Sequence, residues 1–309
     1  MKEKLKFIIL VPYVASTEEQ ESPSAEATFF FEQYFSDAER RQIVGDGLEG
    51  SLYVKEGIGL YIIGEGKTNA SINCTALLND QNFDFSETKF IEFGCCGCMK
   101  EVGVVGDIYL IGETFDMELG HHADSREEDA NASHSWYPNK SFERYGYVNL
   151  ENEFFNKAYE KIKSEKAQTT QEAKDFMAKS FNNEPWALRD PKIMKAASVT
   201  ADAYWKGNYD HENANFIANY YNCKYPFAAT NMEDIAVAQV FNKYNMLDQL
   251  IVFRYAVNTD VFMDGQTPLS LWGEGNGSFD SSGFDSFNNA FPVITKKATE
   301  LVWKIIDAI

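Results

Sequence analysis

Residues 89–97 read KFIEFGCCG, a short apolar run that ends in glycine and cysteine. Five further short runs have a similar apolar character: KFIILVPYV, GLYIIGEG, DIYLIGETF, KAASVTA and QLIVFRYAV. Runs of this length and composition are typical of strands that are buried on both faces, as in mostly parallel sheets. The sequence therefore predicts a mixed, mostly parallel central sheet flanked by helices.

Helical patterns lie between the predicted strands. Residues 68–79 directly follow a strand and a glycine turn. Residues 151–164 and 233–245 carry apolar side chains three and four positions apart, and residues 296–309 (KKATELVWKIIDAI) form an amphipathic helix. Because predicted strands and helices alternate along the chain, we expect an α/β fold with right-handed crossovers.

Composition narrows the classes of partner. The chain has 309 residues, of which 44% are hydrophobic, and a formal net charge of −19, which disfavours binding to nucleic acid or anionic lipid. The apolar run near the N-terminus is too short for a membrane span of roughly 20 residues, and we favour a buried first strand over a signal peptide. Five cysteines, three of them crowded together, indicate a reducing, cytoplasmic compartment.

The cysteine cluster FGCCGC could hold a metal, exchange disulfides or simply be small. Adjacent Cys95 and Cys96 suit one tetrahedral zinc site poorly, and the four histidines are not at paired ligand spacing with them. We therefore expect no metal. Small, weakly polar residues that line a tight turn at a strand end, with Gly97, are the preferred interpretation.

Three other strand ends carry groups that suit a polar ligand. GEGKTNAS begins a helix, where backbone amides favour an anion or a sugar oxygen, although its spacing fits neither a Walker loop nor a dinucleotide fingerprint. TNMED places a carboxylate at a helix start, where it could complement the helix dipole or bind a sugar diol. FRYAVNTD ends a strand with an amide and a carboxylate. The residues concerned are Gly64, Gly66, Lys67, Asn69, Met232, Glu233, Asn258 and Asp260.

The order and spacing of these motifs resemble the nucleoside phosphorylase superfamily, which includes purine nucleoside and uridine phosphorylases and methylthioadenosine nucleosidases. HADSRE, VTADAYWKG and TNMED are most similar to the purine nucleoside permease family. The resemblance runs from about residue 5 to residue 308. It implies a single domain over 1–309 with a three-layer α/β/α arrangement, long loops near 121–150 and 264–290, and a homo-oligomer.

The resemblance also implies a purine nucleoside ligand and roles for individual residues. Glu233, with Met232, would hold the ribose hydroxyls, Asn258 would contact the purine near N7, and Asp260 is a second candidate acid. Cys95, Cys96 and Gly97 would lie under the ribose and base. Val199, Tyr204 and Trp205 belong to the segment that would stack on the base.

The phosphate site departs from the pattern of the phosphorylases. Cys95 stands where a hydroxyl commonly touches phosphate, and Glu92 replaces an arginine. Candidate substitutes for that arginine are Lys67, Ser16, Thr17 and Arg126. Candidates for the acid that activates water in the nucleosidases are Glu18, Glu19 and Glu21.

These features support a leading hypothesis and two alternatives. The first is cleavage of the N-glycosidic bond of purine nucleosides, by phosphorolysis or hydrolysis, with phosphate as a candidate co-substrate and no other cofactor. The second is a non-catalytic nucleoside-binding protein that supports uptake. The third, a redox or metal protein built on FGCCGC, is the weakest.

Overall fold

The computed structural model describes residues 2–12, 26–43, 51–127, 129, 132, 134–141, 143–267 and 285–309. The candidate residues Ser16, Thr17, Glu18, Glu19 and Glu21 lie outside these ranges, as does most of the predicted loop near 264–290. Within the described residues, no helix combines the length and the apolar character that a membrane crossing requires.

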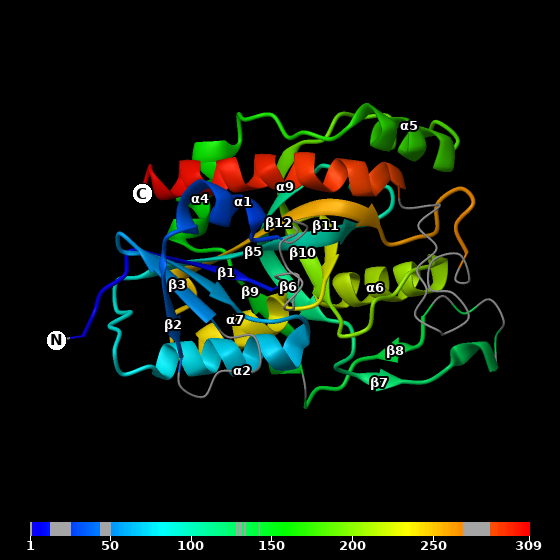
Figure 1. Cartoon of the computed structure of the whole chain (residues 1–309). Helices are drawn as coiled ribbons and strands as arrows, with labels where there is room; N and C mark the ends of the chain where they lie inside the picture. Colours follow the sequence, from blue (N-terminus) through cyan, green and yellow to red (C-terminus); the bar gives the residue numbers. More distant parts are fainter. Residues whose placement is uncertain are drawn as a thin grey trace, which may run out of the picture.

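A large sheet forms the centre of the molecule (Figure 1). All six predicted strands are present, and four further strands join them. The strands are β1 (Phe7–Val11), β2 (Glu39–Gln42), β3 (Ser51–Lys55), β4 (Ile58–Ile62), β5 (Lys89–Cys98), β6 (Ile108–Asp116), β9 (Tyr147–Asn149), β10 (Ile193–Thr200), β11 (Phe227–Asn231) and β12 (Leu250–Thr259).

The sheet is mixed, as predicted, but it is partly closed and has as many antiparallel as parallel pairs, which corrects the mostly parallel part of the prediction. The parallel pairs are β1 with β4 and β5, β12 with β5, and β10 with β6 and β11. The antiparallel pairs are β12–β6, β11–β5, β2–β3, β3–β4 and β6–β9. Because β11 also returns to β5, strands β5, β12, β6, β10 and β11 close into a ring. An apolar strand inside such a ring is buried on both faces whatever its direction, so hydrophobicity alone does not reveal the pairing.

Helices cover the sheet on two sides (Figure 1). On one side lie α1 (Thr28–Phe30), the adjoining π-helix Phe31–Phe35, α4 (Glu153–Ile162), α5 (Gln171–Ser180) and α9 (Asp285–Ile306). On the other lie α2 (Gly66–Asn79) and α7 (Asp234–Lys243), with α6 (Asn208–Tyr220) beside the far end of the ring. The 3-10 helix Leu247–Gln249 precedes β12.

The two predicted long loops need adjustment. Residues 121–150 include the short hairpin of β7 (His121–His122) and β8 (Trp136–Tyr137), the 3-10 helix Ser125–Glu127, α3 (Glu143–Gly146) and β9. The predicted loop 264–290 overlaps the start of α9, which begins at Asp285. The C-terminal helix is therefore longer than its amphipathic part alone indicated.

Aromatic packing fixes the N-terminal segment against the sheet. Phe30 is fully buried, with its ring edge-on to Phe93 of β5 at 4.9 Å between centroids and 5.8 Å from Trp303 of α9. Ala27 is also buried. Because Phe30 and Ala27 are anchored in this way, Glu26 just before them is held at the carboxyl end of β5.

A buried carboxylate shapes the turn that leads into β6. Asp107 accepts hydrogen bonds from the backbone N–H of Val104 (3.0 Å) and Lys192 (2.8 Å) and from the Tyr109 hydroxyl (3.1 Å). Arg189 donates to both carboxylate oxygens: Nη1 donates at 2.7 Å to Oδ1, which also accepts from Lys192, and Nη2 donates to Oδ2, which also accepts from Val104 and Tyr109. The side chain of Asp107 is completely buried, so each of these donors depends on it.

We predict that Asp107→Ala lowers the free energy of unfolding by about 3–5 kcal/mol, because Arg189 and two buried amides lose their acceptor. Urea unfolding measures the loss. Asp190→Ala is the control, since Asp190 is exposed and pairs with Lys174 at the surface, and it should leave stability unchanged. Equal effects of the two substitutions would contradict this role for Asp107.

Candidate functional site

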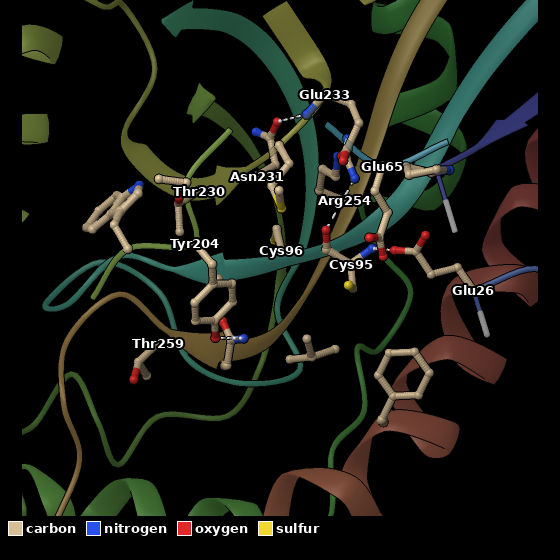
Figure 2. Close-up of a pocket in the computed structure, with 18 residues that line it drawn as sticks. Glu26, Glu65, Cys95, Cys96, Tyr204, Thr230, Asn231, Glu233, Arg254 and Thr259 are labelled. Atoms are coloured by element: carbon tan, nitrogen blue, oxygen red, sulfur yellow. Dashed lines mark hydrogen bonds and ion pairs between the residues drawn. The ribbon is translucent and has the colours of Figure 1, made fainter. Parts of the chain in front are cut away.

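A cavity of about 300 Å³ opens at the ends of β5, β11 and β12 (Figure 2). Side chains from the N-terminal segment, the β4–α2 turn, the loop after β10 and α9 complete it. The lining residues are Pro12, Glu26, Glu65, Cys95, Cys96, Gly97, Ala203, Tyr204, Trp205, Thr230, Asn231, Met232, Glu233, Arg254, Val257, Asn258, Thr259 and Phe291.

Arg254 lies directly against the backbone of β5. A Cβ atom on Gly94 would sit 2.2 Å from Arg254 Nη1, so only glycine permits this approach. Arg254 Nη1 donates to the carbonyl oxygen of Cys95 at 3.2 Å. The glycine in FGCCGC therefore makes room for the guanidinium, and Cys95 and Cys96 form part of the cavity wall.

Glu26 accepts a hydrogen bond from the backbone N–H of Cys95 (Figure 2). Only 3% of Glu26 is exposed. Burial raises the pKa of the Glu26 carboxyl to about 7, with Arg254 and the Cys95 N–H opposing the rise and Glu233 adding to it. The group therefore changes protonation near neutral pH.

Glu233 is held by two elements that are far apart in sequence. Its Oε1 accepts from the backbone N–H of Gly66 at 3.0 Å, and its Oε2 lies 3.1 Å from Arg254 Nη2. Burial raises the pKa of Glu233 above its usual range, although Arg254 and the Gly66 N–H lower it. The start of α7 is capped instead by Asn231, whose Oδ1 accepts from the N–H of Glu233 (3.1 Å) and of Asp234 (2.9 Å). The Glu233 carboxyl is thus directed to the cavity rather than to its own helix.

The hydrogen-bond donors of the turn before α2 bind carboxylates of the protein itself. Besides the bond from Gly66, the N–H of Lys67 donates to Asp202 Oδ1 at 2.7 Å, and Lys67 Nζ pairs with Asp116 and Glu118. Gly64, Gly66, Lys67 and Asn69 are not among the residues that line the cavity, whereas Glu65 is. The predicted ligand loop therefore orients Glu233.

The opposite end of the cavity carries no ionised group among its described residues. Asn258 Nδ2 donates to the Tyr204 hydroxyl at 2.7 Å, and burial raises the pKa of Tyr204 to about 12 (Figure 2). Trp205, Met232 and Cys96 line the wall beside them. This end offers amide and phenol groups for a neutral heterocycle.

Two further predicted site residues lie outside the cavity lining. Val199 is fully buried in β10, within the core. Asp260 is buried beyond the end of β12, where it accepts from the N–H of Lys100 at 2.8 Å and pairs with His211 Nδ1. Asp260 therefore fixes α6 to the end of β12.

The positive charge at the cavity is paired with carboxyl groups of the protein. Arg254 is the one basic residue among the described lining residues, and its Nη2 lies 2.7 Å from Glu92, 3.1 Å from Glu233 and 2.6 Å from Asp234. Arg126 is exposed and pairs with Asp124. In the described part of the chain, no group of three or more His, Cys, Asp or Glu is placed to hold a metal ion.

A family model described as "Purine nucleoside permease (NUP)" matches residues 7–307. The chain belongs to the purine nucleoside permease family. A relative from Schizosaccharomyces pombe, described as a "Probable purine nucleoside permease", is 26% identical over 191 residues, which is 56% of this chain. The match spans about half the length, 54%, of that relative.

The solved structures most similar to this member of the permease family include 5′-methylthioadenosine/S-adenosylhomocysteine nucleosidases. The Neisseria meningitidis protein, in complex with methylthio-immucillin-A, has a TM-score of 0.59 at 13% identity and covers 99% of this chain and all of that one. The Streptococcus pneumoniae and Helicobacter pylori proteins both have TM-scores of 0.58, at 14% and 13% identity, with the same coverage. The predicted membership of the purine nucleoside permease family is confirmed, and the fold is shared with these nucleosidases.

Sequence reasoning missed several lining residues of this permease-family chain. Glu26 sits in SAEATFF, which carries no motif, and only the packing of Phe30 brings it to the site. Glu65 lies within the glycine-rich turn, for which the sequence predicted only Gly64, Gly66, Lys67 and Asn69 as ligand residues. The sequence did contain one signal for the site: Arg254, the arginine of the motif FRYAVNTD.

Glu26 should make stability depend on pH. Its pKa is about 7 in the folded protein against 4.5 ordinarily, so its stabilising contribution is present below pH 4.5 and is lost as the pH rises through 7. We predict that Glu26→Gln removes this loss and is more stable than the wild type at pH 8, by about 3 kcal/mol, with little difference at pH 4.5. Urea unfolding at both pH values tests this, with the exposed Glu32→Gln as control; a less stable Glu26→Gln at pH 8 would refute it.

Proposed function

We propose that this protein hydrolyses the N-glycosidic bond of a purine nucleoside and releases the free base. One observation carries the proposal: the Glu26 carboxyl sits on the Cys95 amide, beside Arg254, with a pKa of about 7. A carboxyl poised near the working pH accepts a proton from water efficiently. Glu26 would therefore activate the water that attacks the sugar carbon.

The other cavity residues suit the remaining steps. Glu233 would accept hydrogen bonds from ribose hydroxyls, and the carboxylates at this end of the cavity would stabilise positive charge that develops on the sugar. The electron pair of the broken bond passes to the purine. The Asn258 amide can donate a hydrogen bond to that base, which lowers the barrier because the charge is largest in the transition state.

The charge of the cavity favours water over phosphate as the nucleophile. Its described lining residues include Glu26, Glu65 and Glu233, and the Arg254 guanidinium is already in contact with protein carboxylates. A phosphate anion would enter a site that repels it. In addition, the Cys95 amide, a natural donor to an oxyanion, is occupied by Glu26.

The comparisons agree with a purine nucleoside as ligand. The similar solved structures are named as nucleosidases, and they include complexes with 5′-methylthioadenosine and with adenine. We extend to this chain only the ligand class, since the likeness is one of fold. Homo-oligomer formation and a cytoplasmic location stay predictions.

A second candidate function is nucleoside binding in support of uptake. The matching family and the Schizosaccharomyces pombe relative are named as permeases. In addition, the Asn258 amide can donate a hydrogen bond but cannot deliver a proton to a departing base. Binding without turnover would satisfy both observations.

We predict that the purified protein releases free base from at least one of inosine, guanosine, adenosine and methylthioadenosine in phosphate-free buffer. Chromatography of the reaction identifies the base. Release that strictly requires phosphate would contradict hydrolysis, whereas tight nucleoside binding with no product would favour the uptake role.

We further predict that Glu26→Gln lowers kcat about 10²- to 10⁴-fold, the usual contribution of a general base. In the wild type, activity should fall as the pH drops below about 7, because protonated Glu26 cannot accept a proton from water. The measurement is a pH–rate profile of both proteins, with Glu32→Gln as the control on the same segment. A variant that keeps the wild-type rate would remove Glu26 from the mechanism.

A further inference from the structure

The carboxyl groups around Arg254 outnumber its single positive charge. Glu92, Glu233 and Asp234 all lie within 3.1 Å of Arg254 Nη2, and Arg254 and Glu92 are 1% and 0% exposed. Glu26 adds a fourth carboxyl nearby, as its electrostatic coupling to Arg254 shows. Several uncompensated negative charges in one buried cluster are costly, so the folded protein gains by keeping a proton there.

Hydrogen bonding distinguishes Asp234 from the other members of the cluster. Asp234 Oδ1 accepts from Arg254 Nε at 2.7 Å and lies 2.6 Å from Arg254 Nη2. Its Oδ2 accepts from the Ser198 hydroxyl at 2.6 Å and from Asn231 Nδ2 at 2.7 Å. Both oxygens are thus served by donors, as an ionised carboxylate requires.

Glu92 has the opposite environment. Its Oε1 contacts Arg254 Nη2, but its Oε2 is buried without a hydrogen-bond donor. An ionised Glu92 would bury negative charge on an oxygen that no donor compensates, a cost that protonation removes. Burial and the nearby Glu92 carboxyl raise the pKa of the Cys74 thiol on α2, so this neighbour is neutral and supplies no compensating charge.

The protonation behaviour agrees with this geometry. Burial raises the pKa of Glu92 well above its usual range; the carboxylates of Asp234 and Glu233 add to the rise, and Arg254 opposes it. A neutral Glu92 leaves fewer negative charges to compete for the guanidinium, which also contacts Asp234 and Glu233.

We propose that Glu92 is a neutral, protonated acid that acts as a positioning residue, fixing Arg254 so that Arg254 holds Glu233 at the ribose end of the cavity. The positioning part rests on the proposed function. The buried proton itself does not, because it follows from the carboxyl contacts alone.

Infrared spectroscopy of the full-length protein tests the proton directly, without substrate. At pH 9, two units above the pKa of Glu26, the wild type should show the carbonyl band of a protonated carboxylic acid. Glu92→Gln should lose that band. Glu113→Gln should keep it, because Glu113 is a buried carboxylate that accepts from the Tyr147 hydroxyl at 2.6 Å and the Tyr225 N–H at 2.9 Å. A wild-type band unchanged by Glu92→Gln, or no band at all, would overturn the proposal.

Kinetics test the positioning role. Because glutamine resembles a protonated glutamate in shape and charge, Glu92→Gln should keep kcat/KM within about threefold and leave the pH–rate profile unchanged. Glu92→Ala should raise KM about tenfold or more through a displaced Glu233, and the rescue by glutamine separates this effect from unfolding. A large loss in a folded Glu92→Gln would show that the negative charge is needed and would overturn the proposal. If no nucleoside is cleaved by any variant, the proposed function fails, while the infrared result still decides the proton.

Discussion

The buried guanidinium of Arg254 is the group on which the rest of the site depends. It lies against Gly94, contacts the carboxyl groups of Glu92, Glu233 and Asp234, and donates to the Cys95 carbonyl. An unpaired charge at this depth would be very costly, so these partners hold one another in place. A cavity wall with fixed carboxylates follows from this arrangement.

The partly closed sheet explains how distant segments reach one cavity. The pairing of β11 with β5 closes the ring, so the end of β11 with Asn231 lies beside the end of β5 with Cys96 and Gly97. The anchored Phe30 then brings Glu26 to the same place. Rigid strands and a buried aromatic cluster thereby preorganise groups that local sequence leaves far apart.

Much of the fold and part of the site could be predicted from the sequence. Cys95, Met232 and Asn258 lie at strand ends or helix starts, and strand ends in α/β folds present ligand groups. Asp260 was harder to place, because β12 is irregular between Ala256 and Asn258 and ends at Thr259, so the next residue turns away from the cavity. Glu26 gave no local signal, since its position depends on tertiary packing alone.

The acidic residue Glu92 has one meaning in the sequence and another in the structure. In the sequence it stands as an obstacle to phosphate, whereas in the structure it is a buried partner of Arg254, with Glu26 occupying the nearby Cys95 amide. Both observations support the proposal that the nucleophile is water. The most direct test is to identify the sugar product by nuclear magnetic resonance in the presence of saturating phosphate. The account predicts free ribose sugar and no sugar phosphate; formation of the sugar 1-phosphate would contradict it.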